Sequence, residues 1–534
     1  MTQSTAGTGS IAIHPAGEPL QRPPTGHVYF SMTKSLCAQC KRSVDAKIQF
    51  EGDAVYFRKF CPEHGHQECL VASSVEWYLD ALSFVAPSTP PRAGNGEIRA
   101  VKGGCPHDCG PCTSRRQKVY MPVVPITSAC NLDCPICYTV NKNEDAHMLS
   151  REAFAKILEH LKAQHDELDI INFTGGEPTL HPELPELLRM SREAGIRRLT
   201  VSTNGLKLLK EEYVEELAKV DARIVLSLDT YDDAIDKQLL GATTTRSKLK
   251  VLDLLETHDV TTTILPAIAA GLNDRDVPQL FEEVLKRRNI CSLEMHTLTF
   301  TGQGGVGFDR TARITTPDLH RILEQHTGGQ LTARDFVPSP LAHPHCYSIC
   351  YLLMLDPEPD HAADAARFVT YAQLFGREVL FDLLGDSLYI QPREKVEEVL
   401  RTAMDELWAD PDRLKESERV LKTLKRLLLE MFPPGKTIPL EERQKIAERA
   451  TKAIYIHSHM DEESFDVARV MKCSIGVPET DGSNIPTCSY NVLYRERDQR
   501  FADPAMIQRM DAAVAEVHPH LRDGKRSLPL ITRG

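Results

Sequence analysis

The pattern of hydrophobic and polar positions is most regular between residues 118 and 300. Six apolar runs alternate there with helix-like segments. The apolar runs are Val119–Ile126, Leu168–Phe173, Leu199–Ser202, Arg223–Leu228, Thr261–Ile268 and Ser292–Leu298. The helix-like segments are 150–164, 182–195, 208–220, 244–258 and 276–289. This alternation predicts an α/β fold in which a parallel sheet curls into a partial (β/α)6 barrel, because six repeats fall short of a closed barrel.

The sequence on either side of this array is less regular. Before it, residues 46–57 alternate between apolar and polar side chains, which predicts a β-hairpin. After it, Thr316-Pro317 marks the start of a helix, and 394–432 is a charged helical run. We therefore expect a flexible tail (1–26), a small hairpin module (27–84), a Pro/Gly linker (85–97), a cysteine-containing segment (98–117), the barrel (118–335) and a cysteine-containing C-terminal domain (336–534).

Composition narrows the class of protein. The chain has 534 residues, of which 41% are hydrophobic, and a net charge of −12, which argues against binding nucleic acid through bulk positive charge. The first 30 residues have no apolar segment behind a basic start, so we expect a cytoplasmic protein. In a reducing cytoplasm, its 15 cysteines favour metal binding over disulfides.

The strongest motif directly follows the first apolar run. It is Cys130-x3-Cys134-x2-Cys137, followed by Tyr138. Three thiolates on one loop can hold three irons of a [4Fe–4S] cluster and leave the fourth iron open to a substrate. The alternative is a zinc knuckle that uses a distant fourth ligand.

A second motif, Thr174-Gly175-Gly176-Glu177-Pro178, ends the second apolar run. Its glycines allow close backbone approach, and its carboxylate suits an ammonium group. Together the two motifs resemble the radical S-adenosylmethionine (SAM) superfamily. The resemblance implies that the cluster binds SAM and generates a 5′-deoxyadenosyl radical, which abstracts hydrogen from an unreactive C–H bond. It also implies SAM contacts at the ends of the third and fourth runs, from Ser202, Asn204, Ser227 and Asp229.

The remaining cysteines predict further metal sites. Cys37-x2-Cys40 and Cys61-x2-His64 have the spacing of a rubredoxin or zinc ribbon, which would hold one mononuclear Fe or Zn with either His64 or Cys69 as the fourth ligand. A second Cys-x3-Cys-x2-Cys motif lies ahead of the barrel, one further cysteine lies within the barrel, and four lie beyond it. These eight are enough for one or two auxiliary [4Fe–4S] clusters: Cys105, Cys109, Cys112, Cys291, Cys346, Cys350, Cys473 and Cys488.

The order of these features resembles one branch of the superfamily. The CPEHG segment, the cysteine-rich stretch at 103–112 and the pattern between His457 and Asn491 are similar to the tetraether lipid synthase group, which is also described as pterin-directed radical SAM methyltransferases. The resemblance implies C–C bond formation between lipid alkyl chains, with a substrate radical held on an auxiliary cluster sulfur. It also implies a lipid or small-molecule substrate and a one-electron donor such as flavodoxin or ferredoxin.

Three other functions remain open. A radical SAM methyltransferase acting on a pterin-like heterocycle would use the same core, and so would a multi-cluster maturase with a SPASM-like C-terminal domain. An electron-transfer protein would not need the Gly-Gly-Glu-Pro segment.

Two further segments bear on the site. In 413–432, Leu421, Leu424 and Leu428 share one helical face, which fits either an interfacial helix making peripheral membrane contact or a helix packed on the barrel. The Gly-rich run 301–307 lacks the Lys-Ser/Thr of a phosphate loop and is interpreted as a flexible active-site loop.

Overall fold

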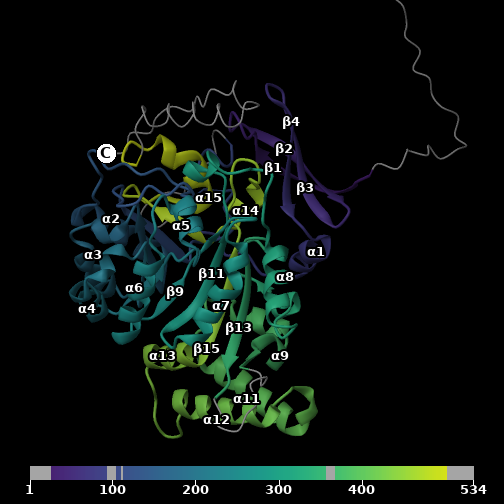
Figure 1. The fold of residues 1–534 in the computed structure, drawn as a ribbon, viewed down its shortest axis with the longest axis vertical. Coiled ribbons are helices and arrows are strands. Elements are labelled where there is room, and N and C mark those ends of the chain that lie inside the picture. Colours follow the sequence, from purple (N-terminus) through teal and green to yellow (C-terminus); the bar gives the residue numbers. More distant parts are fainter. Residues whose placement is uncertain (1–25, 93–103, 110–111, 357–366, 502–534) are drawn as a thin grey trace, which may run out of the picture.

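The computed structural model describes residues 26–92, 104–109, 112–356 and 367–501. Residues 1–25 of the predicted tail, parts of the predicted linker and cysteine-containing segment, and the chain beyond 501 lie outside the described residues. Figure 1 shows a large curved sheet with helices around it, a small sheet of strands β1–β4 beside it, and a helical group of α11–α13 at one end.

The large sheet runs through the molecule in the order β12-β13-β15-β11-β9-β8-β7-β6-β5-β16-β17, with β10 paired to β11 and β14 to β13. Its strands are β5 (Met121–Thr127), β6 (Ile170–Gly175), β7 (Arg198–Thr203), β8 (Ala222–Leu226), β9 (Thr262–Ile264), β10 (Ala267–Ile268), β11 (Ile290–Thr297), β12 (Val337–Pro338), β13 (Tyr347–Met354), β14 (Phe368–Thr370), β15 (Thr451–His457), β16 (Ile475–Pro478) and β17 (Asn484–Pro486).

The six predicted strands are confirmed as β5, β6, β7, β8, β9–β10 and β11, and neighbouring members pair in parallel. The predicted helices between them are also present, and α5 was not predicted. They are α2 (Arg151–Gln164), α3 (Leu184–Glu193), α4 (Glu211–Lys219), α5 (Asp233–Leu240), α6 (Thr245–Thr257) and α7 (Val277–Lys286). Among the described strands, β12 and β17 at the two edges of the sheet do not pair with each other, so the barrel is partial, as predicted.

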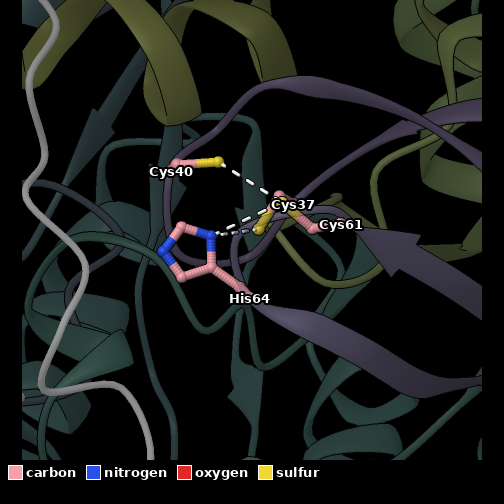
Figure 2. Close-up of side chains that lie close together, drawn as sticks. All are labelled: Cys37, Cys40, Cys61 and His64. Atoms are coloured by element: carbon pink, nitrogen blue, oxygen red, sulfur yellow. Dashed lines mark hydrogen bonds between the residues drawn. The ribbon is translucent and has the colours of Figure 1, made fainter.

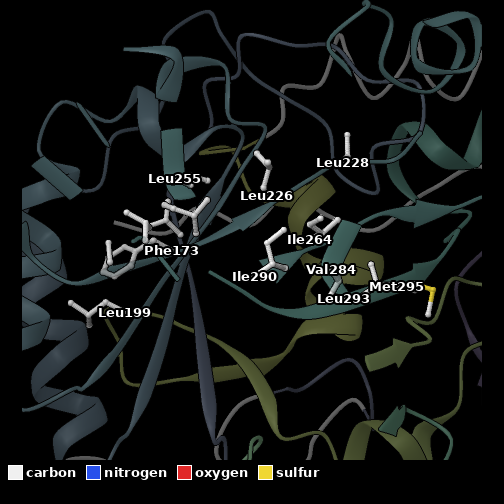
Figure 3. Close-up of a cluster of buried hydrophobic side chains, with 14 of the residues drawn as sticks. Phe173, Leu199, Leu226, Leu228, Leu255, Ile264, Val284, Ile290, Leu293 and Met295 are labelled. Atoms are coloured by element: carbon white, nitrogen blue, oxygen red, sulfur yellow. The ribbon is translucent and has the colours of Figure 1, made fainter. Parts of the chain in front are cut away.

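The hydrophobic core fills the space between the parallel strands and these helices (Figure 3). Leu199, Leu226, Ile264 and Leu293 come from four different strands and are fully buried. Each such side chain stabilises the fold by about 1.5–3 kcal/mol relative to an exposed one. The core thereby holds the C-terminal ends of the strands, where the candidate site lies, in one rigid frame.

The region beyond residue 335 extends the same sheet instead of forming a separate one. Strand β15 pairs in parallel with β11, β13 pairs antiparallel with β15, and β16 pairs in parallel with β5 at the other side. Six of the seven residues of β15 are buried. This explains why no alternation of polar and apolar residues marks it, because a central strand is covered on both faces.

The N-terminal module is a four-stranded antiparallel sheet, packed against helix α1 (Val75–Ser83). The predicted hairpin is confirmed as β2 and β3, which pair in register from Ala46–Lys59 to Glu51–Ala54. The strands are β1 (Val28–Leu36), β2 (Ser43–Glu51), β3 (Ala54–Cys61) and β4 (Gly65–Ala72).

The charged run 394–432 forms two helices that pack within the protein. In α12, one face is buried in a second hydrophobic cluster and includes Val420, Leu424 and Leu428, so it faces protein and not a membrane surface. In the described part of the chain, no helix has the length and hydrophobicity needed to cross a bilayer. The helices of this region are α8 (Thr316–His326), α9 (Tyr371–Phe375), α10 (Arg377–Leu383), α11 (Glu394–Ala409), α12 (Ser417–Met431), α13 (Leu440–Ala450) and α14 (Val467–Met471).

Candidate active site and metal centres

The three cysteines of the strongest motif lie on the loop that follows β5. Cys130, Cys134 and Cys137 are partly buried, and all three line one cavity. Burial raises the pKa of Cys130 to about 12 and also raises that of Cys134, so these thiols need nearby positive charge to ionise. Iron would supply that charge, and three thiols facing a shared space fit a cluster with one open iron.

The Gly-rich run 301–307 holds this loop in place. Gly304 donates its backbone N–H to the carbonyl of Cys137 at 2.8 Å, and the Gln303 side chain donates to Asp133 at 2.7 Å. A Cβ on Gly302 would lie 2.4 Å from the backbone of Tyr138. The interpretation of this run as a flexible loop is therefore replaced by a packing role, since its glycines let two backbones touch.

The Thr174–Pro178 segment approaches the cysteine loop from β6. Gly175 has φ +154°, and a Cβ on Gly176 would lie 2.2 Å from the carbonyl oxygen of Ala129. Both glycines are thus required by the close approach of the two loops. Thr174 also lines the cavity, whereas Pro178 is buried at the start of a short 3-10 turn.

Glu177 lies at the cavity wall and is tied to its surroundings. Its carboxylate accepts hydrogen bonds from the side chain and N–H of Thr179, from the hydroxyl of Thr203 at 2.7 Å, and from the N–H of Asn204 at 2.8 Å. Burial raises the pKa of Glu177, and these donors oppose that effect. Glu177 therefore links the ends of β6 and β7 while facing the cavity.

The other predicted contacts lie around the same rim. Asn204 donates to the side chain of Asn131 in the cysteine loop at 2.7 Å, and Ser202 and Ser227 line the cavity. Asp229 lies 3.6 Å from Lys248, a fully buried lysine that our sequence analysis missed because it sits inside the helical pattern of α6. Ser202, Asn204 and Ser227 thus line the cavity at the C-terminal ends of β7 and β8. Asp229 is buried against Lys248 and is not one of the residues that line the cavity.

The cavity has a volume of about 330 Å³ and extends along the inside of the sheet. At one end are the cysteine loop and Glu177; at the other are Arg198 and Tyr389. The first and the last residues of both β6 and β7 line the cavity. At about 3.3 Å per residue, the cavity therefore spans roughly 17 Å. Its polar interior residues are Asn172, Thr200, Ser202, Thr263, Ser292 and Glu294.

Several cavity residues were missed or undervalued in the sequence. Glu294 and His296 lie on β11, and His457 and His459 lie at and beyond the end of β15. Glu294 and His296 were not selected from the sequence, and His457 was included only as part of a C-terminal pattern. The alternating positions of Glu294 and His296 on one face of a strand were the available signal.

The N-terminal module brings together one predicted set of ligands (Figure 2). The Nδ1 atom of His64 lies 3.5 Å from the sulfurs of both Cys37 and Cys61, and the sulfur of Cys40 lies 3.9 Å from that of Cys61. Tetrahedral Zn–S bonds of about 2.3 Å place sulfurs roughly 3.8 Å apart, so the geometry fits a mononuclear metal. Cys69 is buried elsewhere on β4, with its sulfur directed to the carbonyl of Leu70.

The eight remaining cysteines divide into two groups of three and two single residues. Cys105, Cys109 and Cys112 form one group; burial, together with the neighbouring thiols, raises the pKa of Cys105 to about 12. Cys346, Cys473 and Cys488 form the other, lining a small pocket beside Arg469.

The two groups are close to each other. The buried guanidinium of Arg115 interacts electrostatically with the thiols of the first group. It also donates a hydrogen bond to the carbonyl of Cys473, in the second group, at 2.9 Å. Each group offers three thiols and is a candidate ligand set for an auxiliary [4Fe–4S] cluster. The structure does not bring Cys291 or Cys350 to either group: Cys291 contacts Thr263 and Ser292 on the sheet, and Cys350 lies in the main core. A lone cysteine in a buried strand acts as a small apolar residue.

Comparison with known proteins agrees with this arrangement. Residues 124–284 match the model of the radical SAM superfamily, and residues 29–73 match the HMPTM N-terminal zinc ribbon domain. Over 515 residues the chain is 26% identical to the 7,8-dihydro-6-hydroxymethylpterin dimethyltransferase of Methanocaldococcus jannaschii, covering 88% of this chain and 96% of that protein.

Two further similarities each cover part of the chain. Over 165 residues it is 32% identical to the GTP 3',8-cyclase of Chlorobaculum tepidum, covering 30% of this chain and 48% of the cyclase. The crystal structure of Streptococcus suis SuiB is 22% identical, with a TM-score of 0.34, over 40% of this chain and 46% of that one.

Proposed function

We propose that this chain, a radical SAM enzyme with an N-terminal zinc ribbon, methylates a carbon atom of a pterin-like heterocycle. The observation that supports this most directly is the cavity that joins the cysteine loop to a polar interior. The full-length similarity to a pterin dimethyltransferase supports the substrate class. A [4Fe–4S] cluster held by Cys130, Cys134 and Cys137 would, with bound SAM and one electron, supply a 5′-deoxyadenosyl radical to remove a hydrogen atom from a C–H bond of the ring. A second SAM would supply the methyl group and, with a second electron from the donor, leave as S-adenosylhomocysteine beside 5′-deoxyadenosine and methionine.

The protein's own residues would bind and orient the heterocycle. Asn172 and Ser202 on β6 and β7, and Ser292 on β11, offer amide and hydroxyl groups along the inside of the sheet. These groups match the alternating donors and acceptors of a pterin ring. An enclosed site also keeps water from a reactive substrate radical.

Glu294 would add a charged contact for the amino edge of the ring. Burial alone would raise the pKa of Glu294, but a hydrogen bond from His296 at 3.0 Å and the imidazole of His457, whose Nδ1 lies 3.8 Å away, outweigh it and hold the pKa well below its ordinary value. The carboxylate is therefore charged at neutral pH. A carboxylate accepts hydrogen bonds from an amine about twice as strongly as a neutral group does.

The experiment is an anaerobic reaction of the iron-reconstituted protein with SAM, a one-electron donor such as flavodoxin or ferredoxin, and 6-hydroxymethyl-7,8-dihydropterin. We expect 5′-deoxyadenosine and a pterin heavier by one CH₂ group, both absent with Cys134→Ala. If 5′-deoxyadenosine forms but the pterin is unchanged, this substrate assignment is wrong.

A second candidate function is coupling of lipid alkyl chains, and the length of the cavity favours it. Apolar side chains line the end far from Glu177, including Met121, Ile170 and Leu388. Lipids from anaerobic cells expressing the protein would then contain species two hydrogens lighter than the sum of two chains, absent with Cys134→Ala. Unchanged lipids would exclude this candidate.

A further inference from the structure

Three histidines converge on one wall of the cavity. His296 on β11 and His457 on β15 are register partners in two parallel strands, so their side chains lie side by side. His459 follows two residues later, and its ring centre lies 4.1 Å from that of His457 and 4.9 Å from that of His296. We propose that these three histidines bind a divalent transition-metal ion, beside the group of Cys346, Cys473 and Cys488 whose pocket His457 and His459 also line.

The spacing of the rings suits a metal. One ring nitrogen from each histidine lies within 4.8 Å of one from each of the others. Zn–N bonds of about 2.0–2.1 Å in a tetrahedral site place nitrogens roughly 3.4 Å apart, so small ring rotations complete the geometry. Imidazole ligands suit zinc, iron, copper and nickel.

Two further observations indicate a ligand at this point. The Nδ1 atom of His457 is buried and has no hydrogen-bond partner among the described residues, which is costly for a polar atom unless something binds it. Glu294 accepts a hydrogen bond from Nε2 of His296 at 3.0 Å. A carboxylate paired with a ligating histidine is the usual arrangement around a protein-bound metal, since it fixes the ring orientation.

Packing and charge around the three rings are consistent with a bound cation. His457 stacks on Tyr347 with ring centres 3.9 Å apart, and the Glu294 carboxylate faces Nε2 of His296 at 3.0 Å and Nδ1 of His457 at 3.8 Å. A divalent ion held by the imidazoles would lie next to this carboxylate and balance its charge.

The site would have an open position on the cavity side, because all three histidines line the cavity. Three protein ligands with an open position are typical of catalytic metal sites. A nitrogen or oxygen of the substrate would occupy it. The identity of that donor rests on the proposed function, whereas the metal site does not.

The test is a measurement of zinc binding to the full-length, iron-reconstituted protein by equilibrium dialysis under anaerobic conditions. We expect two zinc ions per chain, one in the ribbon and one at the histidines. His457→Gln should bind one, and the exposed His326→Gln, a matched control on α8, should still bind two. Zinc X-ray absorption of the wild type should show an all-nitrogen/oxygen site that is lost in His457→Gln, leaving the sulfur-rich ribbon site.

Two results would overturn the proposal. One is a single zinc ion in the wild type whose absorption spectrum shows only the ribbon ligands. The other concerns His459, whose Nδ1 lies 3.7 Å from the sulfur of Cys488. If His459→Gln lowers iron content and leaves zinc unchanged, His459 is a cluster ligand and not part of a zinc site. Pterin turnover enters neither result, so failure here is distinct from failure of the proposed function.

Discussion

Replacing Gly176 with alanine tests how tightly the two loops of the SAM site are packed. The added Cβ would lie 2.2 Å from the carbonyl oxygen of Ala129, and real Cβ atoms essentially never come closer than 3.0 Å. That carbonyl must therefore recede by about 0.8 Å. It also accepts a hydrogen bond from the N–H of Glu177 at 2.7 Å, which the shift would lengthen toward 3.5 Å and largely break.

The expected magnitude follows from these two effects. Overpacking costs about 1–3 kcal/mol, and a lost backbone hydrogen bond costs about 1 kcal/mol more. Because Ala129 precedes Cys130, much of this strain falls on the cluster loop. If 2 kcal/mol of it opposes SAM binding, the affinity drops about 30-fold. Calorimetric titration with SAM, together with 5′-deoxyadenosine formation, measures this.

Gly307→Ala is the matched control, because nothing lies within 4 Å of its added Cβ. It should bind SAM like the wild type. The reasoning would be refuted if Gly176→Ala bound SAM within threefold of the wild type with an unchanged melting temperature.

Three other substitutions test buried charge and metal ligation. Glu448 lies 2.6 Å from Arg198 and 2.7 Å from Arg223; burial would raise its pKa, but the two arginines lower it from 4.5 to about 2. The charged Glu448 carboxylate therefore stabilises the folded protein by about 3 kcal/mol above pH 4.5, and this contribution is lost as the pH falls to 2. Urea titrations at several pH values should show this loss in the wild type and not in Glu448→Gln. At pH 7 the variant should be less stable than the wild type. Cys40→Ser should abolish zinc binding in the ribbon and lower the melting temperature, while Cys69→Ser should keep the metal; zinc loss in both would place Cys69 in the site.

The parallel array was predictable because each of its elements has a local signal. The alternation of apolar runs with amphipathic segments indicated every strand from β5 to β11 within a few residues. The cysteine motif after β5 and the glycine motif after β6 are also local signals, and the structure places both at strand ends facing one cavity. Site residues that occur in short motifs at strand ends can be predicted without knowing which distant segments are in contact.

The rest of the site depends on contacts between distant segments. His457 meets His296 only because β15 inserts between β11 and β13, a pairing across more than 150 residues that no local pattern specifies. The choice of His64 over Cys69 depends likewise on which way a side chain points from β4 and the turn before it. The sequence also could not predict which auxiliary cysteines lie together, because their grouping depends on contacts between distant segments.

The insertion of β15 sets the order in which this protein can be assembled. A ribosome that has made residues up to 335 has completed β5 to β11, yet the edge of β11 still lacks the strand that covers it. An uncovered edge strand is a site of aggregation. The wall of the cavity beside the cysteine loop is also missing until His457 emerges, and three of the auxiliary thiols lie at or beyond residue 346. Iron delivered before β15 is made would therefore meet an incomplete pocket, so complete cluster loading follows the synthesis of this strand.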